Sequence, residues 1–158
     1  MKDTFQVKAI GSVNAERGDY HIIIREEYLE ALTGLEDYSH IDIIWWGHLS
    51  DSNEGRKTLK LGKLFKKGPD EIGVFATRAP FRPNPVLAST IRVQEINLKN
   101  GIIHTPFIDA EHGTPVLDIK PYRKMERVKH CTVPEWTAQW PEWFEDAATY
   151  NWDKEINK

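Results

Sequence analysis

The chain has 158 residues, of which 40% are hydrophobic and 28% charged, with a formal net charge of −3. This length suits a single domain with a sizeable core, and the net negative charge excludes a protein that is basic over its whole surface. No apolar run approaches the roughly 20 residues that span a bilayer, the first residues resemble no targeting signal, and a lone cysteine excludes an internal disulfide. We therefore expect a cytoplasmic protein without a membrane segment.

The first part of the chain alternates strand-like segments with one helical pattern. Residues 5–13 and 20–24 show the period-two alternation of strands. Residues 25–38 place apolar side chains at helical spacing, with acids early and a glycine near the end, which predicts a short helix. Residues 39–50 form a nearly continuous apolar run rich in Ile and Trp, which is typical of a buried strand.

Further strands are predicted in the second part. Residues 71–78 and 114–122 read as short strands, and residues 86–98 as a long one. Asn100-Gly101 supplies the residue types that a tight hairpin turn requires, and the chain returns over residues 102–110. The sequence therefore predicts a mainly β fold: a small, β-barrel-like single domain with a short helix after the first strands.

Tryptophans dominate the end of the chain. One helical face collects four aromatic side chains, whose most plausible role is packing: Trp136, Trp140, Trp143 and Phe144. Pro141 is expected to begin a second helix there. We predict a division into a domain over residues 1–130 and a Trp-rich helical C-terminal extension over residues 131–158.

The segment GVFATRAPFRPNP, residues 73–85, is rich in proline and arginine. Each proline holds the preceding residue in an extended conformation, so the segment favours one rigid loop shape. A rigid loop that carries Arg78 and Arg82 suits the binding of a carboxylate or phosphate. The alternative is a turn whose arginines pair with nearby acids.

A second polar segment, DAEHGTPVLDIKPY, spans residues 109–122. Asp109 and Glu111 precede a tight turn at Gly113. Carboxylates and backbone carbonyls at such a turn are suited to bind an amine and a ribose. Asp118 and Lys120 share one strand face by their spacing. The alternative is an acidic loop followed by a surface ion pair.

Other patterns are less specific. The six histidines form no H-x-H, HExxH or CxxC arrangement, so no metal site is predicted, and no Gly-rich phosphate loop is present. Residues 55–68 hold six cations and no acid: Arg56, Lys57, Lys60, Lys63, Lys66 and Lys67. Such a run is either a solvated loop or a surface that contacts phosphates.

GVFATRAPFRPNP, followed by GTPVLDIKPY at residues 113–122, resembles the TsaA-like, or TrmO-type, family of β-barrel methyltransferases that use S-adenosylmethionine. GLEDYSHIDIIWWGH, residues 34–48, is also similar to that family, and the resemblance spans residues 5–125. It implies a short form without the family's C-terminal domain, and a homodimer with the cofactor near the subunit interface. It also implies N6-methylation of a modified adenosine next to a tRNA anticodon. The basic run Arg56–Lys67 is then the expected contact for the tRNA phosphates.

The resemblance further implies a set of cofactor contacts: His48, Leu49, Arg78, Ala88, Asp109, Ala110, Glu111 and His112. Arg78 is expected to hold the carboxylate of the cofactor, and Asp109 or Glu111 its amine or ribose hydroxyls. Asp118 and His48 are alternative general bases, and the residues do not decide between them. Two other functions stay open: methylation of a small molecule, and a non-catalytic module that binds S-adenosylmethionine.

Overall fold

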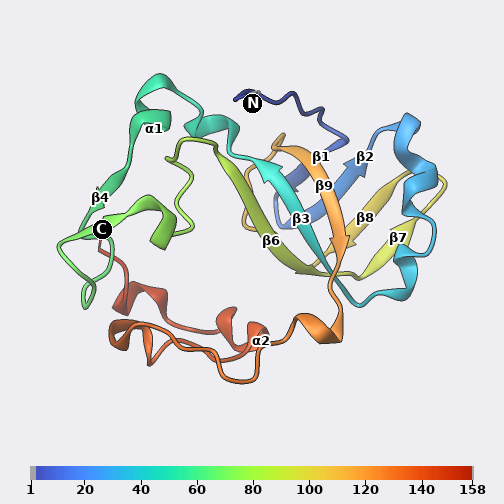
Figure 1. Ribbon diagram of the computed structural model, residues 1–158. Coiled ribbons are helices and arrows are strands. Elements are labelled where there is room, and N and C mark those ends of the chain that lie inside the picture. Colours follow the sequence, from blue (N-terminus) through green and yellow to red (C-terminus); the bar gives the residue numbers. More distant parts are fainter. Residues whose placement is uncertain (1–2, 158) are drawn as a thin grey trace.

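The computed structural model describes residues 3–157 and shows a mainly β chain (Figure 1). Seven strands form one antiparallel sheet: β1 (Gly11–Glu16), β2 (Asp19–Ile24), β3 (His40–Trp46), β6 (Val86–Arg92), β7 (Glu95–Asn97), β8 (Ile102–Thr105) and β9 (Pro115–Pro121). Two more form a separate hairpin: β4 (Lys60–Gly62) and β5 (Glu71–Gly73). The α-helices are short: α1 (Asn53–Lys57) and α2 (Phe144–Ala147). Within the described residues, no helix has the length and apolar character needed to cross a membrane.

The strand order of the large sheet is β6-β3-β9-β1-β2-β8-β7. Its two edge strands, β6 and β7, are joined in the chain by only Val93 and Gln94. One continuous stretch therefore pairs with β3 through its first part and with β8 through its second. The mainly β prediction is confirmed, but across residues 3–157 no ladder between β6 and β7 closes the sheet into a barrel. β6 and β7 follow one another along the chain, so this shared stretch, and not a ladder between the two strands, links the two edges of the sheet.

The core lies on one face of this sheet, to which strand alternation directs every second side chain. Its buried members are mostly β-branched: Val13, Ile22, Ile24, Leu32, Ile41, Ile43, Ile91, Ile103, Ile108 and Val116. Branched side chains pack well on a pleated surface, which explains why the Ile-rich segments form its strands. The residues between them, such as Ile23 and His104, face outward.

The helix predicted over residues 25–38 is present as two 3₁₀ turns, Glu26–Leu32 and Leu35–Asp37. Gly34 separates them with a left-handed backbone, φ 85°, which a residue with a Cβ adopts only at a cost. Leu32 is buried in the core and anchors the first turn. The sequence therefore located this element correctly but predicted too regular a helix.

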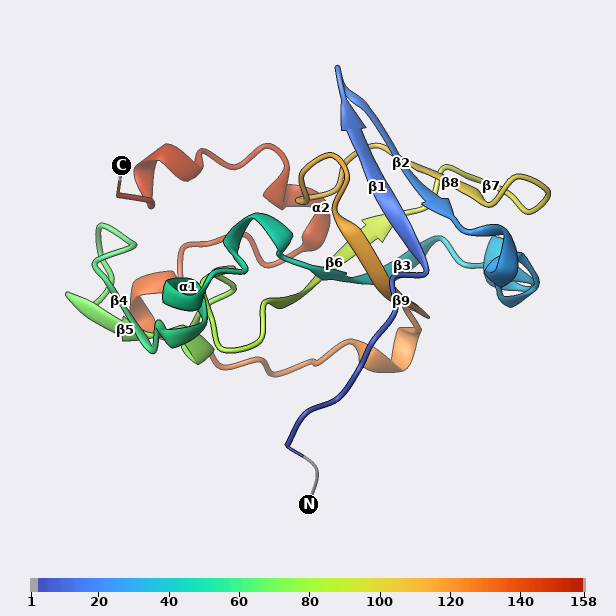
Figure 2. The same ribbon diagram turned by 90° about the horizontal axis from the view of Figure 1, so that it is seen from above.

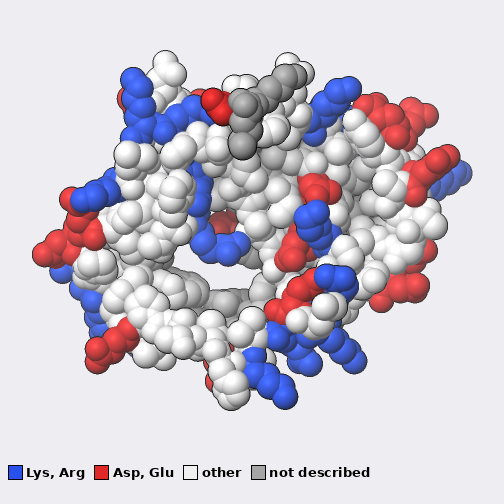
Figure 3. All heavy atoms as spheres, viewed as in Figure 1, with Lys and Arg blue, Asp and Glu red and all other residues white. Residues whose placement is uncertain are grey.

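The C-terminal extension is less helical than predicted. It consists of α2 and the 3₁₀ turns Glu135–Thr137 and Trp152–Lys154, and it arches past the sheet toward the β4–β5 hairpin (Figures 1 and 2). Figure 3 shows a hollow between this arch and the rest of the molecule. Trp136 and Trp140 each lie 5.1 Å from the ring of Phe65, whereas Trp143 and Phe144 are exposed. The expected four-membered aromatic face is thus wrong, because the chain turns between Trp140 and Trp143.

Glu155 anchors the end of this extension. Its carboxylate is buried and accepts hydrogen bonds from Tyr150 Oη (2.8 Å), Gln139 Nε2 (2.9 Å) and Trp140 Nε1 (3.3 Å). The backbone N–H of Lys66 donates to the Glu155 carbonyl over 2.7 Å. These contacts join the last turn to the segment between β4 and β5.

The anchor predicts a pH-dependent extension. The hydrogen bond from Tyr150, followed by those from Gln139 and Trp140, holds the pKa of Glu155 below its usual value. Its contribution to stability is therefore complete above the unfolded-state pKa and is lost as the pH falls through the lowered folded-state pKa. We expect tryptophan fluorescence to shift to the red as the extension detaches in acid.

In Glu155→Gln the same detachment is expected already at neutral pH, since the charged acceptor is gone. The exposed Glu145→Gln serves as the control and should behave as the wild type. Identical fluorescence titrations for Glu155→Gln and the wild type would show that Glu155 is not the anchor.

Candidate functional site

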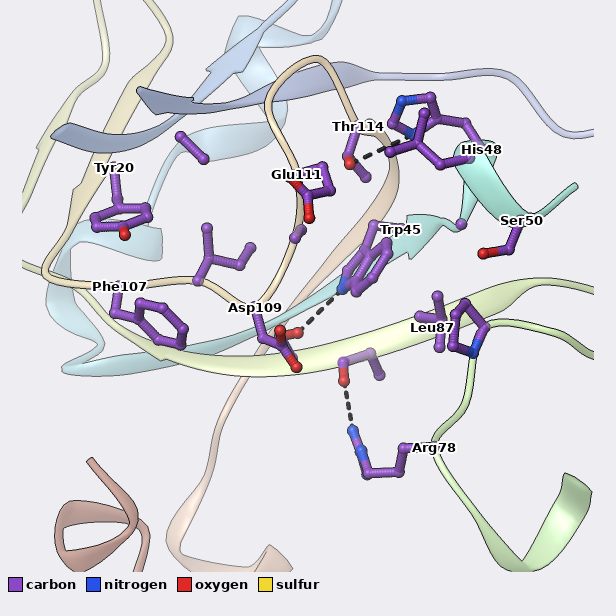
Figure 4. Close-up of a pocket in the computed structure, with 18 residues that line it drawn as sticks. Tyr20, Trp45, His48, Ser50, Arg78, Leu87, Phe107, Asp109, Glu111 and Thr114 are labelled. Atoms are coloured by element: carbon purple, nitrogen blue, oxygen red, sulfur yellow. Dashed lines mark hydrogen bonds between the residues drawn. The ribbon is translucent and has the colours of Figure 1, made fainter. Parts of the chain in front are cut away.

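A cavity of about 490 Å³ opens where three segments meet: the end of β3, the proline-rich loop and the loop that precedes β9 (Figure 4). Its volume is within the range of about 300–1,000 Å³ that small-molecule sites occupy. The sequence patterns at residues 73–85 and 109–122 therefore meet at one place in the fold, although residues 86–108, which contain β6, β7 and β8, separate them in the chain.

Gly47 fixes the proline-rich loop against the end of β3. Its backbone N–H donates to the Pro85 carbonyl over 2.7 Å. A Cβ at this position would lie 2.9 Å from Leu87 Cδ1 and 3.5 Å from Pro80 Cβ. The absence of a side chain thus allows the loop to approach β3 closely.

Two arginines brace the loop through its backbone. Arg82 Nη1 lies 3.3 Å from the carbonyl oxygens of both Thr77 and Ala79. Arg56, from α1, donates through Nη1 to the Pro83 carbonyl over 3.3 Å. Arg82 therefore holds the loop's shape, and it does so by bonding to carbonyl groups rather than by pairing with acids.

Arg78 has a different position, since it is exposed and lines the cavity. Its Nη2 donates to the Ala88 carbonyl on β6, as Figure 4 shows. That is its only hydrogen bond within residues 3–157. Because a guanidinium carries several donors in a planar fork, most of those of Arg78 remain for an anion in the cavity.

The opposite charge comes from the loop before β9, where Asp109 and Glu111 line the same cavity. Ala110, between them, also lines it. The loop returns to β1 through a hydrogen bond from the Gly113 N–H to the Val13 carbonyl, 2.8 Å long. The cavity thus offers a guanidinium from one loop and two carboxylates from another.

Aromatic rings complete the walls. Tyr20, on β2, meets Phe107 edge to face with ring centroids 5.4 Å apart. Trp45, on β3, donates from Nε1 to Ser89 Oγ over 3.0 Å, which fixes the plane of its indole. Such rings offer flat apolar surfaces to a heterocycle and attract cations through their faces.

The structure brings together most of the sequence-predicted site residues. Seven of the eight predicted cofactor contacts line the cavity: His48, Leu49, Arg78, Ala88, Asp109, Ala110 and Glu111. His112 does not line it. The His112 Nε2 atom lies 3.6 Å from Glu16 Oε1, at the tip of the β1–β2 hairpin.

The two candidate bases occupy different places. The His48 ring lines the cavity, with Nδ1 3.4 Å from Thr114 Oγ1. Asp118 is exposed on β9 and does not line it; its Oδ2 lies 2.8 Å from Lys120 Nζ. The predicted surface pair of Asp118 and Lys120 is therefore formed, and His48 is the candidate base that reaches the cavity.

Tyr20, Trp45, Ser89 and Phe107 also line the cavity and were not singled out from the sequence. Each lies in a strand or just after one, where its residue type is explained by packing alone. Only the pairing of β3 with β6, and of β2 with β8, shows that their side chains converge.

The predicted basic run is largely paired. Four of its six cations have partners: Arg56 with Asp51, Lys60 with Glu71, Lys63 with Asp70, and Lys66 with the Asp153 carbonyl. The Arg56 guanidinium, together with the Trp46 indole N–H, holds the pKa of Asp51 below its ordinary value. Within residues 3–157, Lys57 and Lys67 make neither an ion pair nor a side-chain hydrogen bond.

Comparison with known proteins gives a consistent match. The family described as the tRNA-methyltransferase O N-terminal domain matches residues 8–126. A probable S-adenosyl-L-methionine-binding protein from Methanothermobacter thermautotrophicus is 41% identical over 122 residues, which cover 77% of this chain and 81% of that protein.

Two longer proteins are also similar. The tRNA (adenine(37)-N6)-methyltransferase of Escherichia coli is 36% identical over 124 residues, which cover 77% of this chain but 52% of the enzyme. The crystal structure of TrmO from Pseudomonas aeruginosa superimposes with a TM-score of 0.62 at 27% identity, over 82% of this chain and 61% of that one. The chain thus spans about half of the Escherichia coli enzyme.

Proposed function

Because this chain belongs to the family of the tRNA-methyltransferase O N-terminal domain, we propose that its cavity binds S-adenosylmethionine and that the chain is a methyltransferase. One observation carries the proposal: a guanidinium and two carboxylates from separate loops line the same cavity. The amino-acid part of S-adenosylmethionine presents the complementary pair, a carboxylate and an ammonium group. The donor set and the cavity volume both fit this cofactor.

Each wall has a defined task in this proposal. Arg78 binds the cofactor carboxylate through the donors that Ala88 does not use. Asp109 and Glu111 accept hydrogen bonds from its ammonium group and ribose hydroxyls. Trp45 and Phe107 offer ring faces to the adenine and to the positive sulfonium.

Bound S-adenosylmethionine would supply an electrophilic methyl group for the acceptor nitrogen, and breaking of its carbon–sulfur bond would leave a neutral thioether. The protein has little covalent chemistry to perform, so its contribution is alignment of the two reactants. The acceptor amine also loses a proton. His48, oriented by Thr114, is the cavity residue suited to accept it.

The acceptor we favour is N6 of a modified adenosine in tRNA. This choice rests on the printed function of the Escherichia coli relative, of which the chain covers 52%. Since most of the basic run is paired, we place phosphate contacts at Lys57 and Lys67 rather than along the whole run. A purely cofactor-binding module is the second candidate, favoured by the description of the Methanothermobacter relative.

A methyl-transfer assay tests the proposal. The protein is incubated with S-adenosylmethionine labelled in its methyl group and with tRNA that either carries or lacks the modified adenosine. We expect label in the modified tRNA only. Label in a small-molecule fraction would show that the acceptor is a small molecule and not tRNA. Binding of the cofactor with no labelled product in any fraction would favour the cofactor-binding module.

We also propose that the chain forms a homodimer through the apolar rim of the cavity. Leu49 and Phe107 line the cavity and are 72% and 59% exposed, and Phe75, three residues before Arg78 in the proline-rich segment, is 78% exposed. Exposed apolar groups clustered in this way are typical of interfaces. An interface here would bring the partner close to the bound cofactor.

Phe75→Asp is expected to convert the dimer to a monomer, because a carboxylate would be desolvated in the interface. Sedimentation equilibrium measures the change, starting from twice the chain mass of 18.3 kDa. Met125→Asp is the matched control, since Met125 is also 78% exposed but lies in the segment after β9. A dimer that survives Phe75→Asp and dissociates in Met125→Asp would place the interface elsewhere.

A further inference from the structure

Three metal-ligating side chains gather on the outer face of the large sheet, away from the core. Asp19 and His21 lie on β2, and His104 lies on β8. One potential ligand atom of each falls within 4.8 Å of those of the other two. None of these residues lines the cavity described above, so the proposed function does not use them.

Strand geometry explains the gathering. Residues two apart on a strand share a face, which places Asp19 and His21 together. His21 is directly opposite His104 in the β2–β8 register, and their ring centroids are 5.4 Å apart. Glu95 is opposite His104 on β7 and adds another carboxylate on the same face. This cluster could not be predicted from the sequence, because its two histidines are distant in the chain and match no local metal motif.

The hydrogen bonding of the cluster is incomplete. His21 Nδ1 is buried and makes no hydrogen bond to any of residues 3–157. It lies 3.2 Å from Asp19 Oδ2, close enough for attraction but not aligned as a hydrogen bond. Buried polar atoms in native proteins nearly always have a hydrogen-bond partner, and a bound cation would satisfy this atom in place of one.

We propose that Asp19, His21 and His104 form a binding site for a divalent metal ion, and that the bound ion is Zn²⁺. Two imidazoles and a carboxylate are a donor set that suits zinc, and three protein ligands leave one position for water or for Glu95. Tetrahedral zinc with bonds of about 2.0–2.2 Å places its ligand atoms roughly 3.3–3.5 Å apart. The ligand atoms, within 4.8 Å of one another, would have to move closer together to bind the ion.

The site lies directly behind the aromatic wall of the cavity. Tyr20, between Asp19 and His21, points to the other side of β2, and His104 is followed closely by Phe107. A bound ion therefore ties together β2, which carries Tyr20, and β8, which ends two residues before Phe107. The role we assign to it is structural: it fastens β2 to β8 and leaves the methyl-transfer chemistry to the cavity.

Calorimetric titration of the tag-free chain with Zn²⁺ tests the proposal, with Mg²⁺ as the hard-cation comparison. We expect one Zn²⁺ per chain, no heat from Mg²⁺, and slower amide hydrogen exchange in β2 and β8 when zinc is present. His104→Gln should bind zinc more than about 10-fold more weakly. Mutating a residue that only hydrogen-bonds to a metal ligand already lowers metal affinity by at least this factor, and His104 is proposed as a ligand itself. His130→Gln, at an exposed histidine in another part of the chain, is the matched control and should bind as the wild type.

Asp19→Asn is a second variant, for the case that His104→Gln disturbs the folding of β8. The Asp19 side chain is 62% exposed, so its substitution should not disturb the fold. This variant is expected to weaken zinc binding as well. A wild-type chain that binds no zinc, or variants of His104 and Asp19 that bind it as tightly as the wild type, would overturn the proposal. Because this experiment requires no S-adenosylmethionine, its outcome is independent of the proposed function.

Discussion

Replacing Arg78 by alanine is expected to weaken the binding of S-adenosylmethionine by about 10- to 150-fold. This range corresponds to about 1.5–3 kcal/mol, the usual contribution of a hydrogen bond to a charged group. Arg78 is the cation that lines the cavity and has most of its donors unused. Isothermal titration of the wild type and the variant with S-adenosylmethionine measures the change.

Arg92→Ala is the matched control, because Arg92 is also exposed and lies on β6 but does not line the cavity. It should leave the affinity unchanged. Arg78→Lys should recover only part of the binding, since an ammonium group lacks the planar fork. Equal affinities for the wild type and Arg78→Ala would remove Arg78 from the site.

Replacing Ile43 by alanine is expected to lower the free energy of unfolding by about 2–5 kcal/mol, the range for deleting buried methyl and methylene groups. Ile43 is fully buried at the centre of β3, where it is paired with Ser89 on β6 and Ile119 on β9. The strand it supports also carries Trp45 and leads to His48. Urea denaturation followed by circular dichroism measures the loss.

Ile23→Ala provides the comparison within the same sheet. Ile23 is 42% exposed on the outer face of β2, so the same substitution there should cost well below half as much. Cofactor affinity in Ile43→Ala is expected to fall as well, because the cavity wall rests on this part of the core. Equal destabilisation by the two substitutions would contradict the assignment of the inner face.

Much of the sheet could be predicted from local sequence. Alternation and β-branched residues located most strands, as in the buried run that contains Ile41 and Ile43, because those signals are local. The prediction over residues 5–13 was wrong before Gly11, where β1 begins, and the strand predicted over residues 71–78 ends at Gly73. The way in which the two edges of the sheet are joined was not predictable in the same way. It depends on the two residues between β6 and β7, which make one stretch of chain serve both edges.

The site shows the same division. Arg78 and Asp109 were identified because each belongs to an unusual segment, and the resemblance to a family joined the two. Trp45 and Phe107 were missed, since their residue types are equally explained by packing. The partners of the basic run were missed for another reason. Asp51 lies shortly before residues 55–68 and Asp70 shortly after them, and Asp153 is distant in the chain.

A crystal structure of the chain with S-adenosylhomocysteine, the demethylated cofactor, most directly tests the central claim that this cavity is a nucleoside site. We predict that its carboxylate contacts Arg78, that its amine or ribose lies beside Asp109 and Glu111, and that its adenine packs on the aromatic wall. A second cavity is lined by His40 and Tyr122, and density for the ligand there would contradict the account. So would the absence of bound ligand at saturating concentration.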